Sequence, residues 1–302
     1  IALLLALDWG ARMRRQVRWT LATGAAGAVF LLLPLAAAPA RGLEIAFLDV
    51  GQGDAIAIHT PADRWLLVDA GPWDEDYDAG EKRVLPWLRA HGARGIEAMV
   101  LTHPHTDHIG GAAAVMRGMR VGRVIEPGLA FGTPVYQGML ETAHERHVPW
   151  SAARQDRVLT VDGVELDFLW PTVDVLDAPA DANDISAVVR LSYGPFGALL
   201  TGDAPEAVEH ALVTRYGGRL RADVYKAGHH GSHTASSQAL LATVHPRLAV
   251  ISCGRRNRYG HPAPETLARL REDGIAVART DEDGTVVIHV RPGGGAWERE
   301  EP

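Results

Sequence analysis

The chain has 302 residues, of which 47% are hydrophobic and 22% charged, an ordinary globular composition with enough length for one large domain or two modest ones. Its formal charge is −7, and residues 1–40 contribute four Arg and one Asp, so residues 41–302 carry −10. This balance excludes the overall basic charge of a typical nucleic-acid-binding domain, although a metal site supplies positive charge that the sum does not count. The single Cys253 excludes an intramolecular disulfide and a cysteine-based metal site.

The first 40 residues are predicted to be a membrane segment. Residues 1–7 are wholly apolar and the chain does not begin with Met, which suggests the end of one span in a fragment of a longer protein. Residues 8–18 hold four arginines and are expected to form an inner loop. Residues 19–40 carry no charge until Arg41 and are apolar on all faces, so a spanning helix is favoured over a signal peptide or a buried helix of a soluble protein. Everything after this helix is then expected to lie outside.

Beyond the membrane segment, short apolar strands end in polar turns. The predicted strands of the first half are 43–50, 55–59, 65–68, 96–101 and 121–125. Helices are expected at 82–91, 109–116 and 135–146. The first two strands form a hairpin about the turn 51–54. Asp69 ends the third strand, where it either orients a ligand histidine or simply forms a turn.

The second half has the same mixture of strands and helices. Its predicted strands are 164–170, 188–192, 197–200, 222–227, 248–252, 275–278 and 285–290. Its predicted helices are 204–216, 238–244 and 264–272, with a loop between Asp174 and Asp184. Residues 293–302 are expected to be a loose polar tail, which bounds one domain at 41–292. Strands that precede helices in both halves favour two sheets sandwiched between helices, a layered α/β fold.

A dense group of metal-ligand side chains follows the strand at 96–101. His103, His105, Asp107 and His108 occupy four of six consecutive positions. His103 and His105 are two apart on an extended loop, so both rings can bind one divalent ion, while Asp107 and His108 can turn toward a second. A histidine-rich surface loop is the alternative, but the position at a strand end favours a site with two ions.

Two later strand ends carry further ligand-type residues. Asp203 follows one strand, and His229 and His230 follow the next. A lone Asp at such a place is more often a helix cap, but two cations about 3.5–4 Å apart need an anionic bridge, and Asp203 is the candidate for it. His229 is expected to complete the coordination of the second ion, which leaves His230 or His233 to contact substrate. The sequence leaves open which of the adjacent histidines, His229 or His230, is the ligand.

These residues resemble the signature of the metallo-β-lactamase superfamily, His-x-His-x-Asp-His with a later bridging Asp and a terminal His. The resemblance implies an αββα sandwich with a binuclear site at one edge, here preceded by a transmembrane helix. More narrowly, residues 43–290 resemble the C-terminal domain of the ComEC family of bacterial competence proteins, which admit DNA. The motifs that carry this resemblance are Leu48-Asp49-Val50-Gly51-Gln52-Gly53-Asp54-Ala55, Asn183-Asp184-Ile185-Ser186, Leu200-Thr201-Gly202-Asp203, His229-His230-Gly231-Ser232 and Asn257-Arg258-Tyr259-Gly260-His261-Pro262.

The resemblance implies a metal-dependent nuclease or phosphodiesterase that uses two divalent ions, zinc or manganese, and degrades one strand of incoming DNA. It also implies a multi-pass protein of the inner or plasma membrane with the hydrolase domain on the extracytoplasmic side. The implied partners are DNA, the upstream channel portion of the same polypeptide and other competence proteins. One departure concerns the first ion, because many members of the superfamily supply a third His where this chain has Asn183 and Ser186.

Paired ions can prepare a water for attack on phosphorus, and the leaving oxygen then needs a proton. The residues expected to take part in the reaction are Asp107, His230 and His261, with the two histidines as candidate proton donors. The candidate phosphate-binding residues are Lys226, Ser232, Arg255, Arg256 and Arg258, although the three arginines are also compatible with a solvated loop. The residues expected to support the ligands are Asp49, Asp69, Asn183 and Ser186.

Two other functions stay open from the sequence. One is a surface hydrolase of another phosphodiester, such as a choline- or lipid-linked one. The other is a non-catalytic domain that guides DNA to the channel with a partly vacated metal site. The missing third His favours the guiding role, whereas the presence of ligands for both ions argues against it.

Overall fold

The computed structural model of this chain describes residues 13–20, 41–129, 131–177 and 181–301. The chain divides into two units, 1–40 and 41–302. Residues 13–20 are helical, and among the described residues no helix has the length and apolar character that crossing a membrane requires. The predicted span end at 1–7 lies outside the described residues, and so does the predicted spanning helix at 19–40 apart from its first two positions.

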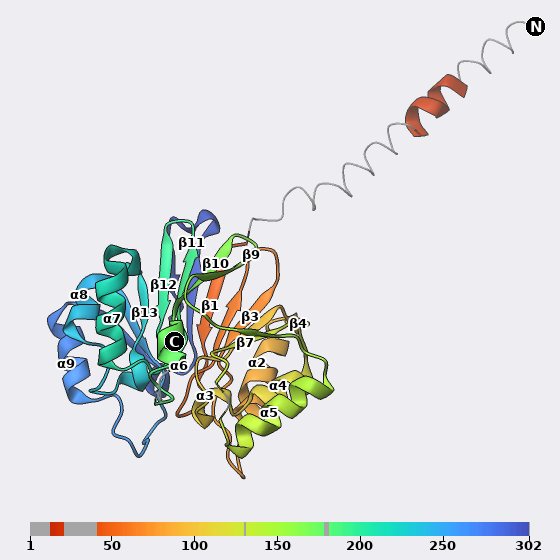
Figure 1. Ribbon diagram of the computed structural model, residues 1–302. Coiled ribbons are helices and arrows are strands. Elements are labelled where there is room, and N and C mark those ends of the chain that lie inside the picture. The colour runs from red at the N-terminus through yellow and green to blue at the C-terminus, as the bar shows by residue number, and fades with distance from the viewer. Residues whose placement is uncertain (1–12, 21–40, 130, 178–180, 302) are drawn as a thin grey trace, which may run out of the picture. The chain divides into compact units, whose positions relative to one another are not determined.

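Two β-sheets lie face to face in the larger unit (Figure 1). The first sheet has the order β17-β16-β1-β2-β3-β5-β7-β8 and the second the order β15-β14-β13-β12-β11-β10-β9. The strands of the first sheet are β1 (Leu43–Phe47), β2 (Ile56–His59), β3 (Trp65–Val68), β5 (Ala98–Val100), β7 (Val124–Glu126), β8 (Trp150–Ala152), β16 (Val286–Val290) and β17 (Trp297–Arg299). Those of the second are β9 (Arg157–Val161), β10 (Val164–Trp170), β11 (Val188–Tyr193), β12 (Phe196–Leu200), β13 (Val224–Lys226), β14 (Leu248–Ile251) and β15 (Ala276–Arg279). A two-stranded sheet joins β4 (Gly95–Ile96) to β6 (Arg120–Val121).

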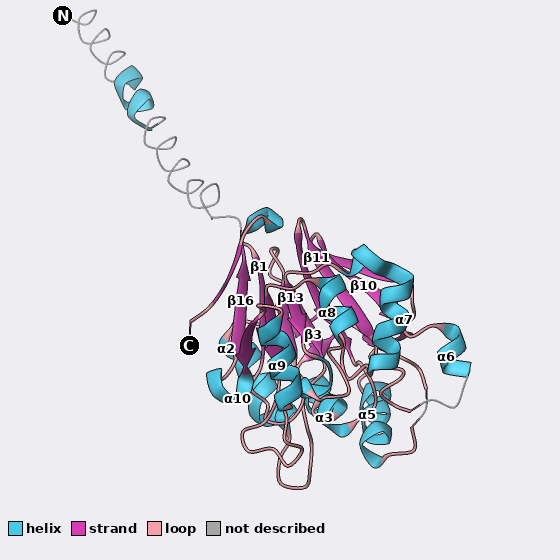
Figure 2. Ribbon diagram, turned by 90° about the vertical axis from the view of Figure 1, so that its left-hand side faces the viewer, coloured by secondary structure: helices cyan, strands magenta, loops and turns pink. Residues whose placement is uncertain are grey.

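Helices cover the outer face of each sheet, as Figures 1 and 2 show from two directions. On the first sheet these are η1 (Gly80–Val84), α2 (Leu85–Ala90), α3 (Thr106–Ile109), α4 (Ala112–Gly118) and α5 (Pro134–Glu145). On the second they are α7 (Glu206–Tyr216), α8 (Gln238–Val244) and α9 (Pro264–Glu272). Short helical turns complete the structure: α6 (Val173–Asp177), η2 (Gly217–Leu220), η3 (Gly228–Gly231), α10 (Thr280–Asp283) and η4 (Pro292–Gly294). The order of layers is therefore αββα, and the predicted layered α/β fold is confirmed.

The apolar strands bury side chains on both faces. In β1, Ile45 and Phe47 point between the sheets, where they meet Phe196 of β12, whereas Ala46 and Leu48 belong to the core beneath the helices. This alternation follows from the two-residue period of a strand. It explains why these strands read as nearly continuous apolar runs rather than as alternating ones.

Several predicted boundaries are wrong. The helix expected at 109–116 is interrupted, since α3 ends at Ile109 and α4 begins at Ala112. At the two glycines between them the backbone lies against a neighbouring segment. A Cβ on Gly110 would stand 2.3 Å from the Trp73 nitrogen, and one on Gly111 2.3 Å from the Ala70 oxygen. A short helix, α6, occupies the first residues of the loop expected between Asp174 and Asp184.

The strands β8, β9 and β17 are absent from the prediction. The tail at 293–302 contains β17, which pairs with β16 and places the Trp297 ring 6.2 Å from that of Phe196, so it is not wholly loose. β9 is the edge of its sheet and exposes Val158, so it lacks the apolar run by which strands are recognised. β9 and β17 each pair with the strand next to them along the chain, β10 and β16, and β8 pairs with β7.

Parallel pairing brings several loops to one end of the sandwich. β3, β5 and β7 are parallel in the first sheet, and β12, β13 and β14 are parallel in the second. The loops that follow parallel strands meet at the carboxyl edge of a sheet, where ligands commonly bind. Both sheets therefore contribute residues to the same edge.

Cys253 provides a test of the packing behind this edge. It is fully buried after β14, and its Sγ donates to Oδ1 of Asp281 at 3.1 Å. Burial, aided by the Asp281 carboxylate, raises the pKa of the thiol to about 12. We expect the native protein not to react with a disulfide reagent such as DTNB at pH 8, and one thiol to react once urea unfolds the chain. Rapid stoichiometric reaction of the native protein would contradict this packing.

Candidate metal centre

His103 and His105 converge after β5. Pro104 disfavours a helix at the preceding residue, and His105 itself is extended, with φ −71° and ψ 145°. The two rings therefore reach the same side of the loop. Nε2 of buried His103 lies 3.1 Å from Nδ1 of His105 and 3.8 Å from Oδ2 of Asp203. The structure thus brings together the three side chains predicted to hold the first ion.

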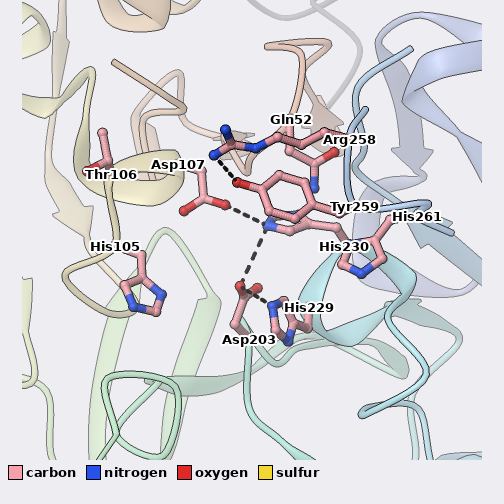
Figure 3. A pocket seen from close by; sticks show the side chains of 10 residues that line it. All are labelled: Gln52, His105, Thr106, Asp107, Asp203, His229, His230, Arg258, Tyr259 and His261. Carbon is pink, nitrogen blue, oxygen red and sulfur yellow. Dashed lines mark hydrogen bonds and ion pairs between the residues drawn. The ribbon is translucent and has the colours of Figure 1, made fainter. Parts of the chain in front are cut away.

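Asp203 also approaches a second group of ligand atoms. Its Oδ1 lies 3.3 Å from Nε2 of His108, and its Oδ2 lies 3.6 Å from Nε2 of His230. The same nitrogen of His230 is 3.2 Å from Oδ2 of Asp107. Figure 3 shows Asp203 between His229, His230 and the loop that carries Asp107. Its carboxylate stands between both groups of ligands, the position that a bridging anion requires.

The adjacent histidines after β13 occupy different places. The side chain of His230 is 2% exposed and faces Asp107 and Asp203, whereas that of His229 is 30% exposed, with Nε2 3.7 Å from Oδ2 of Asp203. Both residues have left-handed backbones, with φ 49° and 54°, a conformation that costs roughly 1–2 kcal/mol for a residue with a side chain. This strain lets consecutive histidines point into one site.

Asp54 joins this group, although the sequence interpretation did not include it among the site residues. One ligand atom each from Asp54, His108, Asp203 and His230 lies within 4.8 Å of the others. The Asp54 backbone nitrogen donates to the Asp107 oxygen at 3.1 Å, which joins its turn to the histidine loop. The available signal was the Gly-x-Gly-Asp turn at the end of a buried strand.

Three buried atoms in this group have no hydrogen-bond partner: Oδ1 of Asp54, Nε2 of His108 and Oδ1 of Asp203. Burying polar atoms without hydrogen bonds is costly, and Oδ1 of Asp203 lies only 3.3 Å from Nε2 of His108, so a cation shared by these atoms would satisfy them. Imidazole nitrogens and carboxylate oxygens are ligands for zinc and manganese. The residues therefore fit divalent metal ions.

In the structure itself, the positive charge of histidine side chains balances the negative charge of the carboxylates. Burial alone would lower the pKa of His230, but Asp203, Asp107 and Asp54 raise it to about 9. Burial would raise the pKa of Asp54, but the Lys226 ammonium and His230 lower it to about 2. A bound divalent cation would replace the histidine protons, as metal binding generally does.

Two of the predicted supporting residues contact the ligands. Asp69 accepts hydrogen bonds from the nitrogen and hydroxyl of Thr102, both at 2.7 Å, and its Oδ2 lies 2.8 Å from Nδ1 of His108. Such a carboxylate fixes the orientation of a ligand imidazole. Ser186 Oγ accepts from the Asp203 nitrogen at 3.3 Å.

The other two predicted supporting residues are placed differently. Asp49 accepts from the Gly51 nitrogen at 3.2 Å and so shapes the turn before Asp54. The buried Oδ1 of Asn183 has no hydrogen-bond partner. Neither side chain has a contact with a ligand among the interactions of the described residues.

A cavity of about 410 Å³ opens beside the ligands. Its lining residues are Gln52, His105, Thr106, Asp107, Asp203, His229, His230, Arg258, Tyr259 and His261 (Figure 3). Of the five predicted phosphate-binding residues, only Arg258 lines it.

The remaining four lie away from the cavity wall. Lys226 is fully buried and donates to Oδ2 of Asp54 at 2.5 Å and to the Gly202 oxygen at 3.1 Å, so its ammonium lies behind the ligands. Ser232 is buried, with Oγ 3.0 Å from Oγ1 of Thr234. Arg255 donates to the Asp281 oxygen at 3.1 Å, and Arg256 is exposed.

The two candidate proton donors differ in their contacts. Nδ1 of His230 lies 3.0 Å from the Ser252 oxygen and its Nε2 faces the carboxylates, so both nitrogens are engaged. Nδ1 of His261 is buried without a partner. Burial and the neighbouring histidines His229 and His230 lower the pKa of His261 to about 4, so its imidazole is neutral at pH 7.

The sequence matches the metallo-beta-lactamase superfamily over residues 48–255, which is most of the chain. The chain belongs to the metallo-beta-lactamase superfamily. The resemblance drawn from the histidine motif is therefore confirmed, and the superfamily accounts for the sandwich and for the histidine loop at its edge.

The chain is similar to ComE operon protein 3 of Bacillus subtilis, with 31% identity over 300 residues that cover 95% of this chain and 37% of that protein. It is 35% identical to competence protein ComA of Neisseria gonorrhoeae over 259 residues, which cover 85% of this chain and 34% of that protein. The chain thus spans about a third of the length of these relatives.

Solved structures support the fold. The diiron β-hydroxylase CmlA of Streptomyces venezuelae matches with a TM-score of 0.56 at 13% identity, over 83% of this chain and 54% of that one. At this identity the likeness concerns the metallo-beta-lactamase sandwich alone.

Asp203→Asn tests the bridging position. An amide carries no negative charge, so we expect the dialysed variant to hold zinc or manganese at least about tenfold more weakly than the original chain, by metal analysis and titration. The exposed Asp177 on α6 offers a matched control, and Asp177→Asn should bind as the original does. Equal metal content in all three proteins would contradict the assignment.

Gly53→Ala tests the joint between the Asp54 turn and the histidine loop. Gly53 has φ +146°, and a Cβ there would stand 2.2 Å from the Asp107 oxygen, whereas Gly51, with φ +84°, has nothing within 4 Å. We expect Gly53→Ala to lower the free energy of unfolding in urea by about 1–3 kcal/mol and to weaken metal binding. Gly51→Ala is the control, because Gly51 also has a positive φ but its added Cβ meets no neighbour, so stability and metal binding should change less. Equal effects of the two substitutions would show that the contact between Gly53 and the Asp107 oxygen is unimportant.

Proposed function

We propose that this chain is a metal-dependent phosphodiesterase that acts as the nuclease portion of a DNA-uptake protein and degrades one strand of incoming DNA. The observation that carries the hydrolase part is the convergence of unpartnered His108 Nε2, Asp203 Oδ1 and Asp54 Oδ1 beside an open cavity. The names of the relatives, one of them a competence protein, support the DNA-uptake part.

Each ion would be held by its own set of side chains. His103, His105 and Asp203 would hold one ion. Asp203 would also hold the other, together with Asp54, Asp107, His108 and His230. Two divalent ions, when bound, supply Lewis-acid stabilisation of the charge on the phosphoryl oxygens. Zinc and manganese both suit this donor set.

Substrate would reach these residues through the cavity. The guanidinium of Arg258 lies on its wall and can pair with a phosphate oxygen in bidentate fashion. His261 presents a neutral imidazole on the same wall, suited to hydrogen-bond a phosphate or leaving oxygen. Lys226 would act indirectly, because its buried ammonium fixes Asp54 and balances its charge.

We also infer the cellular setting from the sequence. The arginines at 12–18 beside the apolar stretch at 19–40 support a multi-pass protein of the inner or plasma membrane with residues 41–302 on the extracytoplasmic side. Its partners would be DNA, the channel portion of the same polypeptide and other competence proteins.

A non-catalytic DNA-guiding role is the second candidate. It is favoured by the three-ligand set of the first ion, since Ser186 contacts only the backbone of Asp203 and Asn183 has no ligand contact. A surface hydrolase of another phosphodiester would share the chemistry proposed above and differ only in substrate.

A nuclease assay decides among these roles. The purified 302-residue chain should cleave labelled DNA when given manganese or zinc, and Asp107→Asn should reduce the rate by about 100-fold or more, because a group acting on the reacting centre is removed. Asp177→Asn serves again as control.

Cleavage that persists in both Asp107→Asn and Asp203→Asn would refute the metal-dependent hydrolase. DNA binding without cleavage under either metal would instead favour the guiding role. Hydrolysis of a small phosphodiester such as bis(p-nitrophenyl) phosphate, with DNA left intact, would point to another substrate.

A further inference from the structure

The loop between β14 and α9 forms the wall of the cavity opposite the histidine loop. It is closed by the carboxamide of Asn257, whose Nδ2 donates to the oxygens of Gly254 and His261 at 2.9 and 2.5 Å. Its Oδ1 accepts from the nitrogens of Tyr259 and His261 at 3.1 and 3.0 Å. One side chain therefore uses donors and acceptor together to fix the loop. The conformation of this wall is thus set before any ligand binds.

This loop is also tied to the metal site. The Gly254 nitrogen donates to Oε1 of Gln52 at 3.0 Å, and Gln52 lies two residues before Asp54. A Cβ on Gly254 would stand 2.7 Å from the Gln52 nitrogen, so the two backbones are in close contact. Whatever the loop holds is therefore kept at a fixed place relative to the ligands.

Tyr259 is the feature of this loop that the proposed chemistry leaves unexplained. Two side chains contact its ring: Arg258, whose Cζ is 5.0 Å from the ring centroid, and His261, whose ring centroid is 5.9 Å away at an interplanar angle of 25°. Nη2 of Arg258 donates to its hydroxyl at 2.9 Å. The residue nevertheless stays 54% exposed. Figure 3 shows all three residues at the cavity that contains Asp107 and Asp203.

An exposed aromatic ring fixed beside a phosphodiester site suits a flat partner. Aromatic side chains and arginine planes are the surfaces on which proteins stack unpaired nucleobases. In a duplex the faces of the bases are covered by their neighbours, so only a single strand or a frayed end can use such a surface.

Charge supports the same assignment. Residues 41–302 carry −10, and Arg258 is the only Arg or Lys among the described residues that line the cavity. Apart from the proposed metal ions, the protein itself therefore offers little basic surface around this cavity for the electrostatic contacts that usually give non-specific affinity for the DNA backbone. Stacking is a contribution to binding that needs no basic surface.

We propose that Tyr259, flanked by Arg258 and His261, is a nucleobase-stacking subsite that holds the unpaired base next to the scissile phosphate and makes the site select single-stranded DNA. This inference rests on the proposed function for its substrate class, and it adds a residue that determines specificity. The subsite involves no covalent step.

The test compares two oligonucleotides of equal length and charge, (dT)10 and a ten-residue strand of tetrahydrofuran abasic sites. Binding is measured by fluorescence anisotropy on the purified 302-residue chain without added metal, so the result does not depend on cleavage. The original chain should bind (dT)10 about tenfold or more tightly than the abasic strand, as a stacked base implies. Tyr259→Ala should remove this preference, Tyr259→Phe should keep it, and Tyr259→Leu, which is apolar but not aromatic, should lose most of it.

Trp73 offers a matched control, because it is a 41% exposed aromatic that lines a different cavity. Trp73→Ala should leave both affinities unchanged. Equal binding of the two strands by the original chain, or equal loss in Tyr259→Ala and Trp73→Ala, would overturn the subsite.

Cleavage assays separate this inference from the proposed function. If the metal-loaded chain cuts both strands equally and Tyr259→Ala cuts as well as the original, the nuclease stands and the subsite fails. If the chain binds (dT)10 through Tyr259 but never cuts it, the subsite stands and the nuclease fails. A preference for single strands over a blunt duplex that disappears in Tyr259→Ala would support both.

Discussion

The site depends on the balance of charge among buried carboxylates. Asp54, Asp69 and Asp203 are each about 1% exposed, and removing an ionised carboxylate from water costs several kcal/mol unless positive charge lies close by. Lys226 compensates Asp54 directly. The positive histidines His108 and His230 face the others, and divalent ions would do so more strongly. The fold can bury this much negative charge only because positive charge accompanies it, and the same arrangement suits the centre to divalent metal ions.

The fold places the ligand side chains at the positions that this balance of charge requires. Ligands come from loops on both sheets, and parallel strands bring those loops to a common edge. Part of the backbone strain lies at the same edge, where Asp69, His229 and His230 all have positive φ. Each strained residue costs about 1–3 kcal/mol, which the packed cores behind the loops must offset. The placement of the ligands therefore lowers the folding stability of the chain.

The sequence predicts those parts of the site whose members are neighbours in the chain. The run from His103 to His108 is recognisable because its ligands are adjacent, and the apolar strands reveal the layered fold because each buries both faces. The contact between Lys226 and Asp54 is different. It joins the ends of strands in separate sheets, and no local pattern distinguishes a buried lysine from one that meets phosphate. Strands β9 and β17 escaped prediction for a different reason. Both are edge strands that pair with the strand next to them along the chain, and neither carries the apolar run by which a strand is recognised.

The hydrogen bond from Gly254 to Gln52 has a consequence for how mutations elsewhere would act. It joins a loop of one sheet to a turn of the other across the mouth of the cavity. The two segments that it joins belong to sheets whose inner faces pack together around Phe47 and Phe196. A change in the volume of either core side chain is therefore expected to strain this hydrogen bond, although neither residue lines the cavity.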